Sequence, residues 1–115
     1  MEQVLSEAEI IERVAAIYQR HETVDGVARY RTALLFEQRD PWVEVRGLSA
    51  PLLMWTVEAD SARGTRTEVR GYQSPEAAKA ACVHWVGEDR QVAWEQVSPS
   101  AITAMMTDIT GVSWR

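Results

Sequence analysis

Apolar and polar residues alternate at every second position in several short stretches of this chain, which is the pattern of half-buried β-strands. Residue pairs that favour turns, such as Asp25-Gly26 and Asp40-Pro41, separate these stretches. The alternation predicts five strands, at residues 27–38, 42–47, 52–59, 65–72 and 91–97. Only Leu35 interrupts the alternation in the first of them.

Three other stretches carry apolar residues at helical spacing, and each begins with a capping signal. Ser6 and Glu9 fit a capping box, in which each side chain bonds to the backbone of the other residue. Ser-Pro pairs at 74–75 and 98–99 combine an N-cap serine with proline at the first helical position. Gly87 is placed to end the middle helix in a left-handed conformation. The sequence therefore predicts helices at residues 6–21, 75–86 and 99–109.

This order of elements, α-β-β-β-β-α-β-α, predicts an α+β fold. Four consecutive strands with short turns favour an antiparallel meander. We therefore expect residues 1–115 to form a single domain, with an antiparallel-dominated sheet of four or five strands and helices on one face of it. The apolar residues expected in the core are Ile10, Val14, Ile17, Leu34, Phe36, Val43, Val45, Trp55, Val57, Ala81, Trp85, Ile102 and Met105.

The composition agrees with a globular domain and disfavours several functional classes. Apolar residues make up 46% of the chain and charged residues 25%. The net charge of −5 disfavours a general binder of nucleic acids or anionic membranes. A single cysteine, Cys82, excludes an intramolecular disulfide and fits a reducing compartment. Neither a signal-peptide pattern nor an apolar run of about 20 residues is evident, so we expect a cytoplasmic protein that does not span a membrane.

No arrangement of reactive residues points to catalysis or to metal binding. Cys82 and His84 are two residues apart on a predicted helix, so their side chains point in different directions. His84 with Glu88 has the i,i+4 spacing of two metal ligands, but a zinc site needs three or four. The chain also lacks a phosphate-binding glycine loop. We therefore predict no enzyme, with no catalytic, cofactor-binding or metal-binding residues.

The strongest candidate for a functional surface is the sheet face that points away from the predicted helices. The alternation places aromatic residues, methionine and arginines on this face, and these residue types are enriched at protein interfaces. A solvated face with cross-strand Arg–Glu pairs is the alternative interpretation of the same residues. The predicted protein-binding residues are Trp42, Glu44, Arg46, Met54, Arg66, Arg70 and Tyr72.

The partner expected on this face is another protein or a second copy of the chain. Small size, acidity and the lack of a catalytic motif favour an inhibitor or accessory factor, of the kind that phages and other bacterial mobile elements carry. The competing functional class is a nucleic-acid-binding domain that uses Arg63, Arg66 and Arg70 on the predicted hairpin of residues 52–72.

One family resemblance bears on that second class. A strand, Gly71 and a helix that opens at Ser74 in SPEAAKAAC resemble the second half of a double-stranded-RNA-binding domain, over residues 52–86. The resemblance implies a similar order of strands and helices. The family carries RNA-gripping lysines directly after that serine, whereas this chain has Pro75 and Glu76 there. That departure removes the phosphate contacts on which the family relies.

Overall fold

A computed structural model of the protein describes residues 6–39 and 48–110. It contains one four-stranded sheet, three α-helices and one short 3-10 helix. The predicted strand at 42–47 lies outside the described residues, as do the predicted residues Trp42, Val43, Glu44, Val45 and Arg46.

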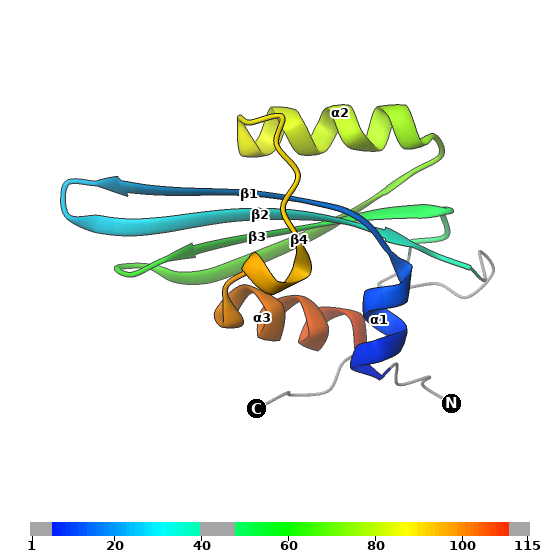
Figure 1. Cartoon of the computed structure of the whole chain (residues 1–115), viewed down its shortest axis with the longest axis horizontal. Coiled ribbons are helices and arrows are strands. Elements are labelled where there is room, and N and C mark those ends of the chain that lie inside the picture. Colours follow the sequence, from blue (N-terminus) through cyan, green and yellow to red (C-terminus); the bar gives the residue numbers. More distant parts are fainter. Residues whose placement is uncertain (1–5, 40–47, 111–115) are drawn as a thin grey trace.

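The sheet is an antiparallel meander in which each strand pairs with its neighbour in sequence (Figure 1). Asp25 and Gly26, with φ angles of 53° and 77°, form the tight turn between the first two strands. Positive φ at both central residues gives a turn whose twist matches that of the strands. The strands are β1 (Val14–Val24), β2 (Val27–Glu37), β3 (Leu52–Asp60) and β4 (Gly64–Tyr72), in the order β1-β2-β3-β4. The prediction of an α+β fold with an antiparallel sheet is confirmed.

The prediction of one helix over residues 6–21 is wrong in its second half. Helix α1 (Glu7–Arg13) begins as expected, and the Ser6 hydroxyl accepts the Glu9 N–H at 3.2 Å. The chain then enters β1 at Val14 and pairs along β2 as far as Val24. The Asp25-Gly26 turn brings this segment back against a strand, and the pairing outweighs the local helical spacing.

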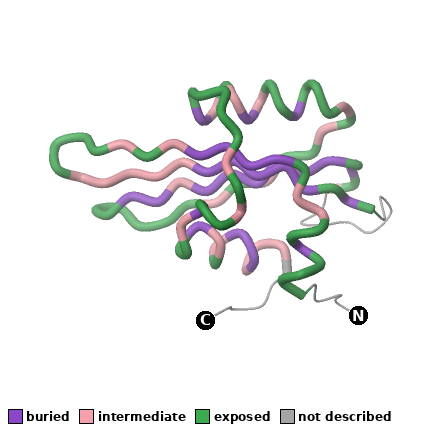
Figure 2. Tube along the Cα trace, viewed as in Figure 1, coloured by how far each residue is buried: buried purple, intermediate pink, exposed green. Residues whose placement is uncertain are grey.

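Helices cover both faces of the sheet, so the prediction of helices on one face is wrong (Figure 1). Helix α3 (Pro99–Thr110) and α1 lie on one side with Trp55 and Phe36, and α2 (Pro75–Val86) lies on the other. Strand β3 is buried on both faces for this reason (Figure 2). Leu35, which interrupts the alternation, is 1% exposed and packs in the α2-side cluster.

Most of the predicted core residues are buried. Those with almost no exposed surface are Ile10, Ile17, Leu34, Phe36, Trp55, Val57 and Met105. Four others are only partly buried: Val14, Ala81, Trp85 and Ile102. Leu34 and Phe36 of β2 lie together with Trp55 and Val57 of β3 on the α3 side, so this side of the sheet is the core that the alternation predicts.

The predicted strand at 91–97 is a connecting segment instead. Gln91 makes one isolated bridge with Tyr18, and the Val92 N–H donates to the Ile17 carbonyl at 2.9 Å. The segment then forms the 3-10 helix η1 (Trp94–Gln96) and leads into α3. It thus passes along β1 from one face of the sheet to the other (Figure 1). Within the described ranges, no helix is long and apolar enough to cross a membrane.

Candidate functional site

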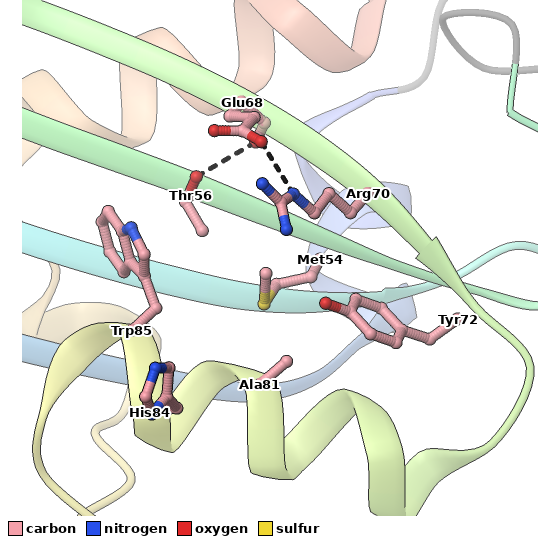
Figure 3. A pocket seen from close by; sticks show the side chains of 8 residues that line it. All are labelled: Met54, Thr56, Glu68, Arg70, Tyr72, Ala81, His84 and Trp85. Atoms are coloured by element: carbon pink, nitrogen blue, oxygen red, sulfur yellow. Dashed lines mark hydrogen bonds and ion pairs between the residues drawn. The ribbon is translucent and has the colours of Figure 1, made fainter.

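A groove lies between α2 and the half of the sheet formed by β3 and β4 (Figure 3). Its volume is about 230 Å³. Three elements contribute the lining residues, which are Met54, Thr56, Glu68, Arg70, Tyr72, Ala81, His84 and Trp85.

The local sequence explains why these side chains converge. On β3 and β4, residues of even number share the α2 side of the pleat, and the register pairs Met54 with Arg70 and Thr56 with Glu68. On α2, Ala81 and Trp85 are four residues apart and therefore lie on one side of the helix. Ser74 fixes where α2 begins, because its hydroxyl accepts the Ala77 N–H at 3.1 Å.

The floor and side walls of the groove are largely apolar. Met54 is 5% exposed and lies at the bottom. The rings of Tyr72 and Trp85, both half-buried, flank it from β4 and from α2 (Figure 3). Two aromatic rings above a flexible thioether form a surface that adapts to an inserted apolar group.

The β4 side of the groove is charged. Arg70 Nε donates to Glu68 Oε1 at 2.7 Å, and the Thr56 hydroxyl donates to the Glu68 carbonyl at 3.3 Å. The hydrogen bond from Arg70 to the Glu68 carboxylate raises the pKa of Arg70, so this guanidinium keeps its charge. The side chains of Arg70 and Glu68 remain 65% and 58% exposed, so both are available to a partner.

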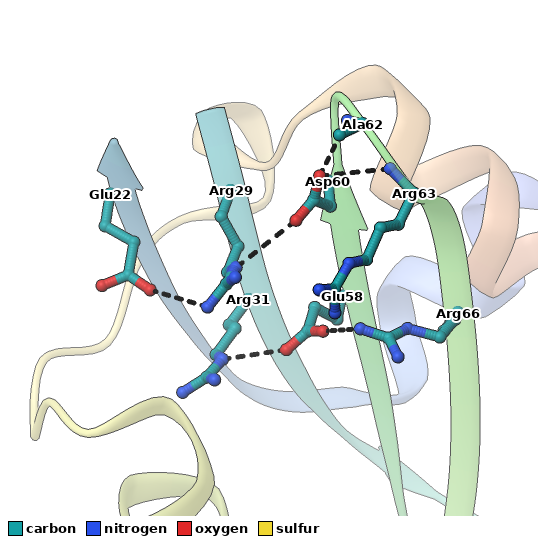
Figure 4. A network of polar contacts seen from close by, with 8 residues as sticks. All are labelled: Glu22, Arg29, Arg31, Glu58, Asp60, Ala62, Arg63 and Arg66. Atoms are coloured by element: carbon teal, nitrogen blue, oxygen red, sulfur yellow. Dashed lines mark hydrogen bonds and ion pairs between the residues drawn. The ribbon is translucent and has the colours of Figure 1, made fainter. Parts of the chain in front are cut away.

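Trp85 is also contacted from the sheet. The Arg31 guanidinium carbon lies 5.9 Å from the centre of its ring, within range of a cation–π interaction. Arg31 Nε donates to Glu58 Oε2 at 3.0 Å, and Glu58 also binds Arg66 (Figure 4). Trp85, at one edge of the groove, is thus held by Arg31, which belongs to a chain of ion pairs across β2, β3 and β4.

A second part of the ion-pair network lies toward the hairpin ends of the sheet (Figure 4). Arg29 bridges Glu22 and Asp60 at 3.6 Å each. The Asp60 carboxylate also accepts the backbone N–H groups of Ala62 at 2.7 Å and Arg63 at 3.2 Å. These hydrogen bonds, with the Ala62 bond as the largest cause, lower the pKa of Asp60. The network stabilises the loop that joins β3 to β4.

The structure brings together only some of the residues predicted from the sequence. Met54, Arg70 and Tyr72 line one groove. Arg66 lies farther along β4 in its ion pair with Glu58. The remaining three, Trp42, Glu44 and Arg46, lie outside the described residues.

The α2 half of the groove was not predicted from the sequence as a binding surface. Trp85 and Ala81 are expected core residues, yet they line the groove together with His84. The spacing 81, 84 and 85 marks one side of a helix and is the signal that could have grouped them. Their position opposite β4 depends on which face of the sheet α2 covers, and the sequence prediction placed the helices on one face only.

Cys82 is unsuited to nucleophilic chemistry. It lies on the side of α2 that faces the sheet and is fully buried, and burial raises the pKa of its thiol to about 12. The thiolate is the reactive form of cysteine, so a protonated thiol at neutral pH is inert. In the parts of the chain that the structure describes, no group of three or more His, Cys, Asp or Glu residues could hold a metal ion.

Comparison with known proteins adds no assignment: no protein-family model, curated protein or solved structure matches this chain.

Proposed function

We propose that the protein is a small non-enzymatic binding module that holds another protein in the groove between α2 and strands β3 and β4. The observation that carries this proposal is the convergence of Met54, Tyr72, Trp85 and Arg70 on one accessible groove. Aromatic residues, methionine and arginine are the types enriched at protein interfaces, and aromatic and arginine side chains contribute most of the binding energy there.

The size of the groove favours a protein partner over a free small molecule. Its volume of about 230 Å³ is smaller than most small-molecule sites, which are roughly 300–1,000 Å³. This space fits one apolar side chain of a partner, inserted between Tyr72 and Trp85 over Met54. The remaining contact area would come from the surface around the groove.

The charged side of the groove indicates what else the partner carries. Arg70 uses Nε to bind Glu68, and its exposed guanidinium has further donors in a planar fork. A carboxylate or backbone carbonyl next to the inserted side chain matches these donors. The proposed partner therefore presents an apolar residue beside an acceptor on an exposed segment.

The same ion pairs argue against the nucleic-acid alternative. Glu58 lies beside Arg66 and Glu68 beside Arg70, so these ion pairs leave the hairpin with little of the net positive charge that phosphate binding needs. With a net charge of −5, the chain offers little of the electrostatic attraction on which nucleic-acid binding depends.

Capture experiments with two groove variants test the proposal. The wild-type protein, Arg70→Ala and Tyr72→Ala are used as bait in a lysate of the source organism, and Arg63→Ala is the matched control on the exposed loop of the same hairpin. We expect a protein that wild type and Arg63→Ala capture and that both groove variants lose. Recovery of nucleic acid that depends on Arg63, or equal capture by all four baits, would contradict the proposal.

The proposed setting is the cytoplasm, as an inhibitor or accessory factor of a phage or another bacterial mobile element. The small size, the acidity and the single buried free cysteine support this proposal. Identifying a captured partner by mass spectrometry tests this setting. A partner that is secreted from the cell would contradict it.

A further inference from the structure

The outer edge of β4 is an accessible row of backbone donors and acceptors. Among the described residues no strand pairs with this edge, because β4 is the last strand in the order β1-β2-β3-β4. The opposite edge of the sheet differs, since Gln91 and Val92 bind β1 there. Residues of β4 are mostly exposed from Gly64 to Gly71.

Edge strands are usually protected against pairing by prolines, charged side chains or bulges. The β4 sequence GTRTEVRGY contains no proline, and its charged residues, Arg66, Glu68 and Arg70, all lie on the α2 side and are of both signs. Its register against β3 runs without a shift from the Asp60–Gly64 pair to the Leu52–Tyr72 pair, so no bulge distorts it. The edge of β4 is therefore regular over its whole length.

Hydrogen bonds in the inner strands determine which β4 groups point outward. The Gln38 N–H donates to the Pro51 carbonyl at 2.9 Å, and the Ser61 N–H donates to the Ala28 carbonyl at 3.1 Å. Odd residues of β3 thus bond to β2, and the alternation of an antiparallel ladder directs even residues of β3 toward even residues of β4. The backbone groups of the odd β4 residues then point away from the sheet, at Thr65, Thr67, Val69 and Gly71.

We propose that two copies of the chain pair antiparallel through β4, with Val69 opposite Val69 of the second copy. This arrangement has a two-fold axis and joins the outward backbone groups of both edges. On the α2 side it places Glu68 opposite Arg70 of the second copy, and Arg66 opposite Tyr72 of the second copy. Each of these pairs is attractive, as ion pair or cation–π contact, and the axis repeats each one.

Shifting the register by two residues in either direction loses this complementarity. One shift sets Glu68 opposite Glu68 and Arg66 opposite Arg70, and the other sets Arg70 opposite Arg70. Like charges directly opposite each other on neighbouring strands are destabilising. A shift of four residues, centred on Thr67, keeps Arg66 opposite Glu68 but loses the contact to Tyr72.

The dimer would extend the groove described above. Glu68, Arg70 and Tyr72 belong to both β4 and the groove lining, so the two grooves would meet across the axis. Arg66 of the second copy would then lie beside Tyr72. The pairing itself rests on the β4 edge alone and does not depend on the proposed partner.

Cysteine crosslinking tests the register directly. Opposite residues of a hydrogen-bonded pair have Cα atoms about 5.5 Å apart, within the range of about 4.4–6.8 Å that a disulfide spans. We expect Val69→Cys to form a disulfide-linked dimer on mild oxidation. Thr67→Cys is the matched control, because the substituted residues of the two copies would be offset along the strands by four residues, or about 14 Å at about 3.4 Å per residue. Crosslinking of Thr67→Cys in preference to Val69→Cys would overturn the register.

Light scattering after gel filtration tests the dimer in the unmodified chain. The expected mass at high concentration is twice the 13.0 kDa of one chain. Arg70→Glu sets a second carboxylate opposite Glu68 across the axis and should return the mass to that of one chain, whereas combining Glu68→Arg with Arg70→Glu should restore the dimer. Arg63→Glu, the same charge change on the loop, should leave the dimer intact. A wild-type protein that is monomeric at every concentration, or an Arg70→Glu variant that dimerises as well as wild type, would overturn the proposal.

Discussion

Replacing Leu35 with alanine tests whether the α2 side of the sheet is a second core. Leu35 is 1% exposed and packs in the cluster formed by β1, β2, β3 and α2. The substitution removes three carbon groups, worth about 2.4 kcal/mol at about 0.8 kcal/mol each. The cavity left behind raises the expected loss of unfolding free energy to about 3–4 kcal/mol, as in other buried leucine truncations. A loss of this size leaves a folded baseline if the wild-type stability is within the usual range of about 5–15 kcal/mol.

Urea denaturation of wild type, Leu35→Ala and Leu34→Ala provides the measurement. Leu34 is 0% exposed and lies in the other cluster, so it reports on the α3 side of the sheet. We expect both variants to lose a similar amount of unfolding free energy, while the slope of the unfolding free energy against urea concentration (the m-value) stays unchanged. If helices covered only the α3 side, Leu35 would face solvent and its truncation would change stability by less than about 0.5 kcal/mol. That result, beside a large loss for Leu34→Ala, would refute the two-sided architecture.

Single positions elsewhere in the chain provide three more tests. The Cys82 thiol, with its pKa raised to about 12 by burial, should resist a thiol reagent at neutral pH until urea unfolds the protein; rapid labelling of the native protein would contradict its placement. Asp60 has a pKa below its ordinary 3.8, so it stabilises the fold above that pH, and the contribution is lost as the pH falls through the lower native value. Asp60→Asn should therefore lower the melting temperature at pH 7 and make the melting temperature depend less on pH in the acidic range. Identical profiles of melting temperature against pH for wild type and variant would refute the role of the bond to Ala62. Gly87→Ala should cost about 1 kcal/mol in urea denaturation, because φ is 88° there, while an unchanged midpoint would mean that α2 ends differently.

The sequence predicts three of the four strands and both long helices because their local signals agree with their final surroundings. The first strand was missed because residues 14–24 show helical spacing but no apolar–polar alternation. Val14 and Ile17 have helical spacing, whereas Ala16 to Gln19 are all buried, with Ile17 on the α3 side of the sheet and Ala16 and Tyr18 on the α2 side. The Asp25-Gly26 pair between two apolar stretches is a strong hairpin signal and could have decided between helix and strand.

One half of the candidate site can be predicted from local sequence patterns, and the other half depends on how distant elements pack. The pleat alone places Met54, Arg70 and Tyr72 on one side of the sheet, and this grouping agrees with the groove. The position of α2 over that side depends on the path of the two-residue link between β4 and α2, Gln73 and Ser74, and no local pattern encodes this path. For this reason Trp85 resembles an ordinary core residue in the sequence, although its ring also lines the groove.

The two short turns of the meander also bear on how the protein folds. Every strand contact in the sheet joins neighbours in sequence, and the turns at residues 25–26 and 61–63 require little loop closure. We expect the hairpins to form early and the helices to pack on the two faces of the sheet at different times. Helix α2 follows β4 directly, whereas α3 can pack only after residues 87–98 have passed along β1. Until α3 arrives, the sheet surface around Phe36 and Trp55 stays open to water. The chain is then most vulnerable to aggregation in the interval between completing its sheet and closing this last layer.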